Sequence, residues 1–258
     1  RGYAYVCAGE YEKAMQDYLA AYEIDSTIAT LTRYCYLAAF LGHRDELTTA
    51  IRQMLPAASS HSDKARLLAC ASLLPDLIED YAPLLAIADD LSTETLLANV
   101  YVRSSVGAIF LRSGDLARAS KILRGTPTGD SRSLVSLTTT FLFFSIAEQR
   151  QDNAQAAATL NRVARDFMKR QPQMDSLNLQ FKHRKPGPLW FEYMGQQLLL
   201  REYQELLEEE YTDGQSTSLA RRIIARQPEA ITGGFCHREC KRFRSLARAV
   251  NSRKEGRT

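Results

Sequence analysis

Length, composition and charge place this chain among ordinary folded proteins. Its 258 residues are 45% hydrophobic and 24% charged, which is typical of a globular protein rather than of a disordered or fibrous one. No stretch approaches the roughly 18 apolar residues that a membrane-spanning helix needs, and the chain does not open with a secretory signal pattern. We therefore expect a substantial core and no membrane segment.

The net charge of +3 is unevenly distributed along the chain. From Leu219 onward, 11 Lys and Arg stand against three Glu, a balance of +8, so the preceding residues carry −5. Such a tail could bind nucleic-acid phosphates, although only Phe235 and Phe243 could stack on bases there. We favour a solvated, partly disordered tail. Nucleic-acid binding stays the alternative function, and folding back onto the acidic body is a third possibility.

The cysteines indicate reduced thiols rather than a disulfide framework. They are Cys7, Cys35, Cys70, Cys236 and Cys240. An odd number without framework spacing favours a cytoplasmic location. Cys236, His237 and Cys240 have the side chains of a metal site, but a structural zinc site needs a second pair of ligands. We predict no metal and no cofactor.

A helical hairpin is predicted at the start of the chain. Six residues recur at steps of three and four, as on one stripe of an amphipathic helix: Tyr11, Ala14, Met15, Tyr18, Ala21 and Tyr22. The segment from Gly2 to Cys7 precedes them as the end of another helix, and a turn at Ala8 and Gly9 separates the two.

These residues resemble the tetratricopeptide (TPR) repeat, a pair of antiparallel helices with small and aromatic residues at set positions. Gly2 matches the small residue at which the two helices cross, and Tyr5 matches the aromatic residue behind it. The second-helix positions are Ala14, Tyr18 and Ala21. Ser26 stands where proline is usual.

The spacing of later glycines predicts further repeats, because a TPR unit is about 34 residues long. Gly42 follows Gly9 by 33 residues, and Gly114 marks the turn of a third hairpin. The third hairpin repeats the first at Gly107, Phe110, Ala119 and Leu123. A fourth, over residues 141–167, has Gln151 in place of the turn glycine and keeps Ala156, Leu160 and Val163 in register.

The remaining segments complete the predicted organisation. Residues 62–91 read as another helical pair, with Pro75 and Pro83 near helix starts. We predict TPR-like repeats over residues 1–181, a linker over 182–188, a capping helix over 189–211 and a basic tail over 212–258. The fold class is all-α: a right-handed superhelical solenoid of degenerate TPR-like hairpins with a C-terminal capping helix.

Three strings also resemble a narrower family, the C-terminal TPR regions of planctomycete-type bacterial serine/threonine protein kinases. They are YCYLAAFLGHRDE, KARLLACASLLPD with the following LLAIADDL, and LWFEYMGQQLLLREYQELL. The resemblance implies a catalytic domain upstream of Arg1, with this segment as its regulatory or docking arm.

No catalytic motif is present in the sequence. The glycine-rich loop, HRD and DFG elements of a kinase are missing, as are the phosphate-binding loop and the HExxH motif. The histidines are scattered in turns or polar stretches: His43, His61, His183 and His237. We expect solvated surface histidines and a segment that is not an enzyme, and keep an unrecognised active site as an open hypothesis.

The TPR resemblance implies that the first helix of each pair lines a concave groove for a protein or peptide. The carried-over positions are Tyr3, Tyr36, Phe40, Tyr101, Arg112, Phe141 and Glu148. On the last of these helices the expected inner face is Thr138, Phe141, Ser145, Glu148 and Gln149. Because this surface is apolar and aromatic, we expect a peptide or helix with apolar anchors rather than a carboxylate tail.

Overall fold

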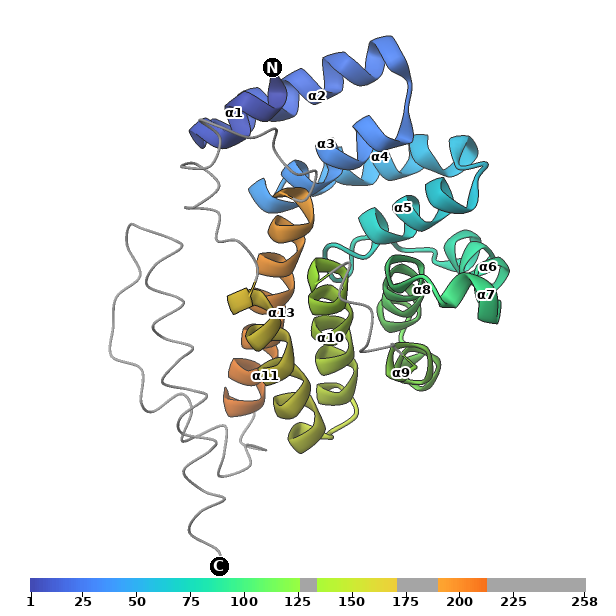
Figure 1. The fold of residues 1–258 in the computed structure, drawn as a ribbon, viewed down its shortest axis with the longest axis vertical. Coiled ribbons are helices and arrows are strands. Elements are labelled where there is room, and N and C mark those ends of the chain that lie inside the picture. The colour runs from blue at the N-terminus through green and yellow to red at the C-terminus, as the bar shows by residue number, and fades with distance from the viewer. Residues whose placement is uncertain (126–133, 171–189, 213–258) are drawn as a thin grey trace, which may run out of the picture. The chain divides into compact units, whose positions relative to one another are not determined.

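The computed structural model describes residues 1–125, 134–170 and 190–212, and within these ranges the chain forms helices and no strand (Figure 1). The all-α prediction is confirmed for this part of the chain. The chain divides into two compact units, Arg1–Arg201 and Glu202–Thr258. The helices up to residue 170 and the segment from Trp190 to Arg201 belong to the first unit. None of the described helices is long and apolar enough to cross a membrane.

The helices follow one another along the chain from α1 to α13. Their bounds are α1 Gly2–Ala8, α2 Tyr11–Asp25, α3 Ile28–Leu41, α4 Arg44–Ala57, α5 His61–Ala71, α6 Ala82–Asp90, α7 Glu94–Leu97, α8 Val100–Arg112, α9 Leu116–Arg124, α10 Leu134–Gln149, α11 Ala154–Arg170 and α13 Trp190–Thr212. The four hairpins predicted from the sequence correspond to α1–α2, α3–α4, α8–α9 and α10–α11. The predicted capping helix, 189–211, agrees with α13 to within one residue at each end.

A residue in the left-handed conformation lies in the turn of each hairpin. Gly9, Gly42 and Gly114 have φ of 75°, 83° and 85°, values that glycine adopts without the steric cost of a β-carbon. In the fourth hairpin this residue is Asp152, with φ of 58°, and not Gln151 as the repeat pattern of the sequence predicted. The correction has a physical reason, since a short Asp side chain tolerates the left-handed region better than Gln does.

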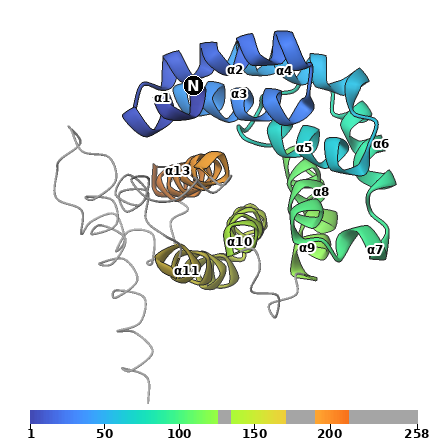
Figure 2. The same cartoon turned by 45° about the horizontal axis from the view of Figure 1, so that its top comes forward.

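The hairpins stack through their first helices. Helices α3, α5, α8 and α10, which we call the central row, each contact the next in this order. Figure 2 shows them following one another, with α4 and α9 paired to α3 and α8. Second helices also contact the next first helix, as α2 does α3 and α9 does α10. Each pair therefore buries its apolar side against its neighbours.

The middle of the chain departs from the prediction at one proline. Pro83 lies in the first turn of α6, as expected. Pro75 does not begin a helix but lies in the non-helical segment that joins α5 to α6, next to Asp76 with φ of 50°. The short helix α7 was not predicted, because its four residues give too few turns for a periodic pattern.

Glycine allows close crossing within two hairpins. A β-carbon built on Gly107 of α8 would lie 2.5 Å from Cδ2 and 2.6 Å from Cγ of Leu123 in α9. One built on Gly2 would lie 3.2 Å from Cε2 of Tyr18. The structure thus confirms that Gly2 and Gly107 are the small residues at which paired helices meet.

We predict that Gly107→Ala destabilises the fold, although alanine favours helix by about 1 kcal/mol over glycine. The clash with Leu123 should cost about 1–3 kcal/mol, so the free energy of unfolding should fall by up to about 2 kcal/mol. Urea denaturation followed by far-UV circular dichroism measures this change.

The double variant Gly107→Ala/Leu123→Ala provides the control, since it removes the side chain that the introduced methyl group would meet. It should lose less stability than the sum of the two single variants. Strict additivity would mean that the two helices do not meet at this glycine.

Candidate functional site

Polar side chains of the central row converge on a small cavity beside the first half of α13. The cavity has a volume of about 20 Å³, enough for one water molecule. Its lining is Tyr36, Ala69, Ser72, Leu73, Tyr101, Ser104, Ser105, Ser136, Thr139, Phe143, Gly195 and Leu199. Because Gly195 and Leu199 belong to α13, this helix closes a surface that the sequence analysis expected to be open.

Two aromatic residues at the start of α13 contact the first two hairpins. The ring of Trp190 stacks on Tyr18 of α2, with centroids 5.8 Å apart and an interplanar angle of 25°. Phe191 meets Tyr36 of α3 edge-on at 5.1 Å and 68°. Trp190 is only 5% exposed, so burial of its ring contributes about 1.5–3 kcal/mol or more.

Gly195 brings the backbone of α13 against Tyr36. A β-carbon at this position would lie 2.8 Å from Cε1 of Tyr36 and 3.6 Å from Cδ2 of Leu73. The tyrosine ring is buried, with 5% of the residue exposed. Any larger side chain at position 195 would therefore have to displace a ring that is packed in place.

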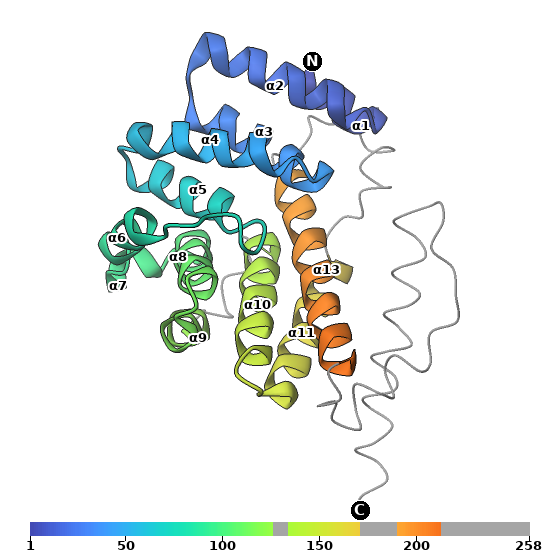
Figure 3. The same ribbon diagram turned by 180° about the vertical axis from the view of Figure 1, so that it is seen from behind.

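Further along α13, Arg201 places its guanidinium over the ring of Phe40, 5.5 Å from the centroid. Phe40 also meets Tyr11 of α2 edge-on, at 5.4 Å. This cation–π contact ties the middle of α13 to α3. The first half of α13 also lies beside α10 (Figure 1, Figure 3), with which it shares the cavity lining.

The capping role predicted for this helix is therefore too narrow. A cap would cover the end of the array, whereas the first half of α13 contacts α2 and α3 as well as lining a cavity with α5, α8 and α10. The amphipathic pattern identified the helix but carried no information on which surface it would meet.

Several of the expected groove residues do lie against α13. Tyr36 and Tyr101 line the cavity, and Phe40 contacts Arg201. Tyr3 lies in α1, in the first hairpin. Burial is the main cause that raises its pKa, and a hydrogen bond with Cys7 is the second.

Arg112 has a buried structural position. Its Nε donates a hydrogen bond of 2.9 Å to the carbonyl of Ser72, and its guanidinium lies 5.8 Å from the ring centroid of Phe143. The residue is 8% exposed. Arg112 thus joins α8 to the end of α5 and to α10, rather than presenting its charge to a ligand.

The residues expected on the inner face of α10 are not among those that line the cavity. Phe141 stacks on Phe167 of α11, at 5.7 Å and 18°, so it lies inside the last hairpin. Glu148 accepts a 2.7 Å hydrogen bond from Asn153 and lies 3.8 Å from Arg124 of α9, which gives it a role in the turn and between hairpins. The residues of α10 that line the cavity are instead Ser136, Thr139 and Phe143.

Burial on nearly all sides explains why the orientation of α10 was difficult to predict. From Ser136 to Gln149 every residue except Thr139 is buried. A helix that is buried on all sides has no polar stripe, so its sequence does not reveal which side faces which neighbour.

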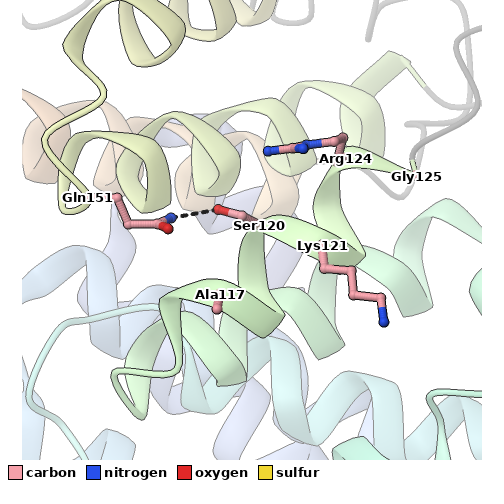
Figure 4. Close-up of a pocket in the computed structure, with 6 residues that line it drawn as sticks. All are labelled: Ala117, Ser120, Lys121, Arg124, Gly125 and Gln151. Atoms are coloured by element: carbon pink, nitrogen blue, oxygen red, sulfur yellow. Dashed lines mark hydrogen bonds between the residues drawn. The ribbon is translucent and has the colours of Figure 1, made fainter.

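A second hollow, of about 410 Å³, opens between α9 and the α10–α11 turn (Figure 4). It is lined by Ala117, Ser120, Lys121, Arg124, Gly125 and Gln151. The amide Nε2 of Gln151 donates a 2.8 Å hydrogen bond to Oγ of Ser120 across it. Gly125 is the last described residue before 126–133, and we assign this hollow no ligand.

Cysteine and histidine side chains are the other candidates for reactive groups. Cys7, Cys35 and Cys70 are free thiols, and burial raises the pKa of Cys35 well above its usual value. His43 precedes α4, with its Nε2 3.4 Å from Glu12. Among the described residues no group of three or more His, Cys, Asp or Glu could hold a metal ion.

Other predicted features lie outside the described residues. They are the linker 182–188, His183, Cys236, His237, Cys240 and the basic tail apart from its first residue. The sequence also offered one signal that was missed, the isolated Gly195 within a helical pattern, which often marks a close packing contact.

No family model matches the sequence, and neither a curated protein nor a solved structure matches it significantly. The resemblances to TPR repeats and to kinase C-terminal regions therefore stay predictions.

Trp190 is the only tryptophan in the chain, so its fluorescence reports whether α13 is docked. We predict that Tyr18→Ala shifts the emission of Trp190 to longer wavelength and increases its quenching by acrylamide, because the stacked ring is lost. Tyr22→Ala, one turn further along α2, is the matched control and should change neither quantity. Unchanged emission in Tyr18→Ala would contradict the docked position.

Proposed function

We propose that this protein is a protein-interaction scaffold, a TPR-like solenoid of helical hairpins that binds a helix of a partner protein along its central row. The observation that carries this proposal is the docking of the first half of α13 on that row. Phe191 and Gly195 both pack on Tyr36 there, and Leu199 closes the cavity beside Tyr101. A surface that accommodates one helix has the shape that a second helix requires.

The chemistry of the contacts suits this kind of recognition. Apolar side chains of α13 are buried at Trp190, Met194, Leu198 and Leu199, and each such side chain contributes about 1.5–3 kcal/mol on burial. Helix-in-groove complexes depend on a few apolar anchors one or two turns apart. The gross gain from four anchors is of the size needed to offset the cost of association, which is about 4–15 kcal/mol.

The proposal extends to the setting of this segment. It acts in the cytoplasm without a reaction or cofactor of its own, as the C-terminal regulatory or docking arm of a larger protein such as a serine/threonine kinase. The resemblance of three sequence strings to the C-terminal TPR regions of planctomycete-type kinases supports the assignment to a larger kinase. A gene whose upstream coding sequence contains a glycine-rich loop, HRD and DFG elements would agree with it, and their absence there would remove the kinase.

Photo-crosslinking in cells that produce the full chain tests the binding surface. A photoreactive residue replaces Tyr101, which lines the cavity, or, as a control, Arg52 on the exposed side of α4. We expect discrete adducts with another protein from position 101 and not from position 52. Adding Tyr36→Ala should reduce the yield at position 101 at least fivefold, because the central contact is lost.

Two results would contradict the proposed function. The first is equal adduct formation from both positions, which would indicate non-specific contact. The second is the absence of protein adducts from position 101 in the native chain and in a chain with α13 displaced. Crosslinks to nucleic acid would favour the alternative function.

A further inference from the structure

The docked half of α13 contains a residue pattern that indicates which kind of helix the central row binds. We propose that the partner helix has an aromatic residue followed four positions later by glycine, and that α13 occupies the partner's site within the same chain until the partner displaces it. This inference rests on the proposed function and adds to it the identity of the recognised motif.

Spacing and geometry both point to this pair of residues. Phe191 and Gly195 are four positions apart, so they lie on one face of α13, one turn from each other. Both meet the same side chain of the central row, Tyr36: the ring of Phe191 lies 5.1 Å away edge-on, and a β-carbon on Gly195 would lie 2.8 Å from Cε1. One tyrosine therefore contacts the aromatic residue and the small residue together.

The glycine is required by the packing of Tyr36. The tyrosine is 5% exposed, and Phe191 lies against its ring, so the ring cannot swing aside to admit a side chain at position 195. Glycine in a helix interior is less favourable than alanine by about 1 kcal/mol. The helix carries this disadvantage at a position where its backbone meets Tyr36.

Contacts on either side set the register of a bound helix. Trp190 stacks on Tyr18 of α2, one residue before the aromatic anchor. Arg201 lies over Phe40 of α3, ten positions after Phe191. A partner with the aromatic and glycine pair should bind more tightly if it also carries an aromatic residue at the position of Trp190 and a cation at the position of Arg201.

The first experiment displaces α13 in the full chain. Gly195→Phe places a ring where Tyr36 already lies, so α13 should leave the central row and Trp190 should become accessible to acrylamide. Gln197→Leu adds bulk two residues further along, at a partly exposed position, and is the matched control that should leave Trp190 buried. Phe191→Ala is a second opening variant, which removes an anchor without adding volume.

The second experiment measures binding of a fluorescein-labelled synthetic peptide of residues 190–212 by anisotropy. The Gly195→Phe and Phe191→Ala chains should bind it at least tenfold more tightly than the native chain or Gln197→Leu, because the tethered helix no longer competes. Far-UV circular dichroism verifies that each chain retains its helices.

Changes in the peptide test the motif itself. Peptides with Gly195→Ala or Gly195→Phe form helix more readily than the original, so weaker binding to the opened Phe191→Ala chain comes from the lost fit. We expect at least tenfold weaker binding for Gly195→Phe. When Tyr36→Ala is added to that chain, the original and Gly195→Phe peptides should bind equally.

The outcomes separate this inference from the proposed function. Equal affinity of native and opened chains for the peptide, or equal binding of the Gly195 variants to the opened chain, would overturn the inference. A scaffold that still crosslinks to a protein at position 101 would then have a partner of another pattern. Loss of those crosslinks would instead remove the proposed function.

Discussion

Close crossing of helices at glycine is the constraint on which this structure depends. Gly2 meets Tyr18, Gly107 meets Leu123 and Gly195 meets Tyr36, and in each case a β-carbon would come within 3.2 Å of the facing side chain. Two of these crossings lie inside hairpins, and the third joins α13 to the central row. Since a packed interior does not yield readily to added volume, each glycine fixes where one helix lies on another. Packing of the hairpins and docking of α13 are thus examples of the same interaction.

The hairpins could be predicted from the sequence because their signals are local. Small and aromatic residues at helical spacing define a stripe, and a glycine marks the turn in three of the four hairpins. The turn needs a residue with positive φ two positions before the next helix, which Gly9, Gly42 and Gly114 provide. Where Asp152 takes this position the sequence was misread by one residue. Asp is an ordinary surface residue in most contexts, so its role depends on a conformation that the sequence does not display.

The candidate site was only partly predictable, because it depends on contacts between distant segments. Tyr36 and Tyr101 were identified because α3 and α8 carry motif residues that orient them. On α10, which is buried on nearly every side, no polar stripe shows the orientation. Phe141 and Glu148, which were expected to face the groove, contact α11 and α9 instead. The surface on which α13 docks could not be predicted, for another reason. An amphipathic pattern indicates that one face of the helix is buried, but it does not indicate which of several apolar surfaces of the array covers that face.

The way in which α13 is connected bears on how firmly it is held. Two to four residues join the helices of each hairpin, so the turn itself brings paired helices together. By contrast, 19 residues of sequence separate Arg170 from Trp190, so no turn of this length joins α13 to α11. Its docking therefore depends on the contacts of Trp190, Phe191 and Gly195. A single docked helix can open at lower free energy than the global fold. A helix that competes with a partner for its own chain's binding surface must open at low free energy. The partner can bind only after the helix has opened, so the cost of opening reduces the partner's affinity.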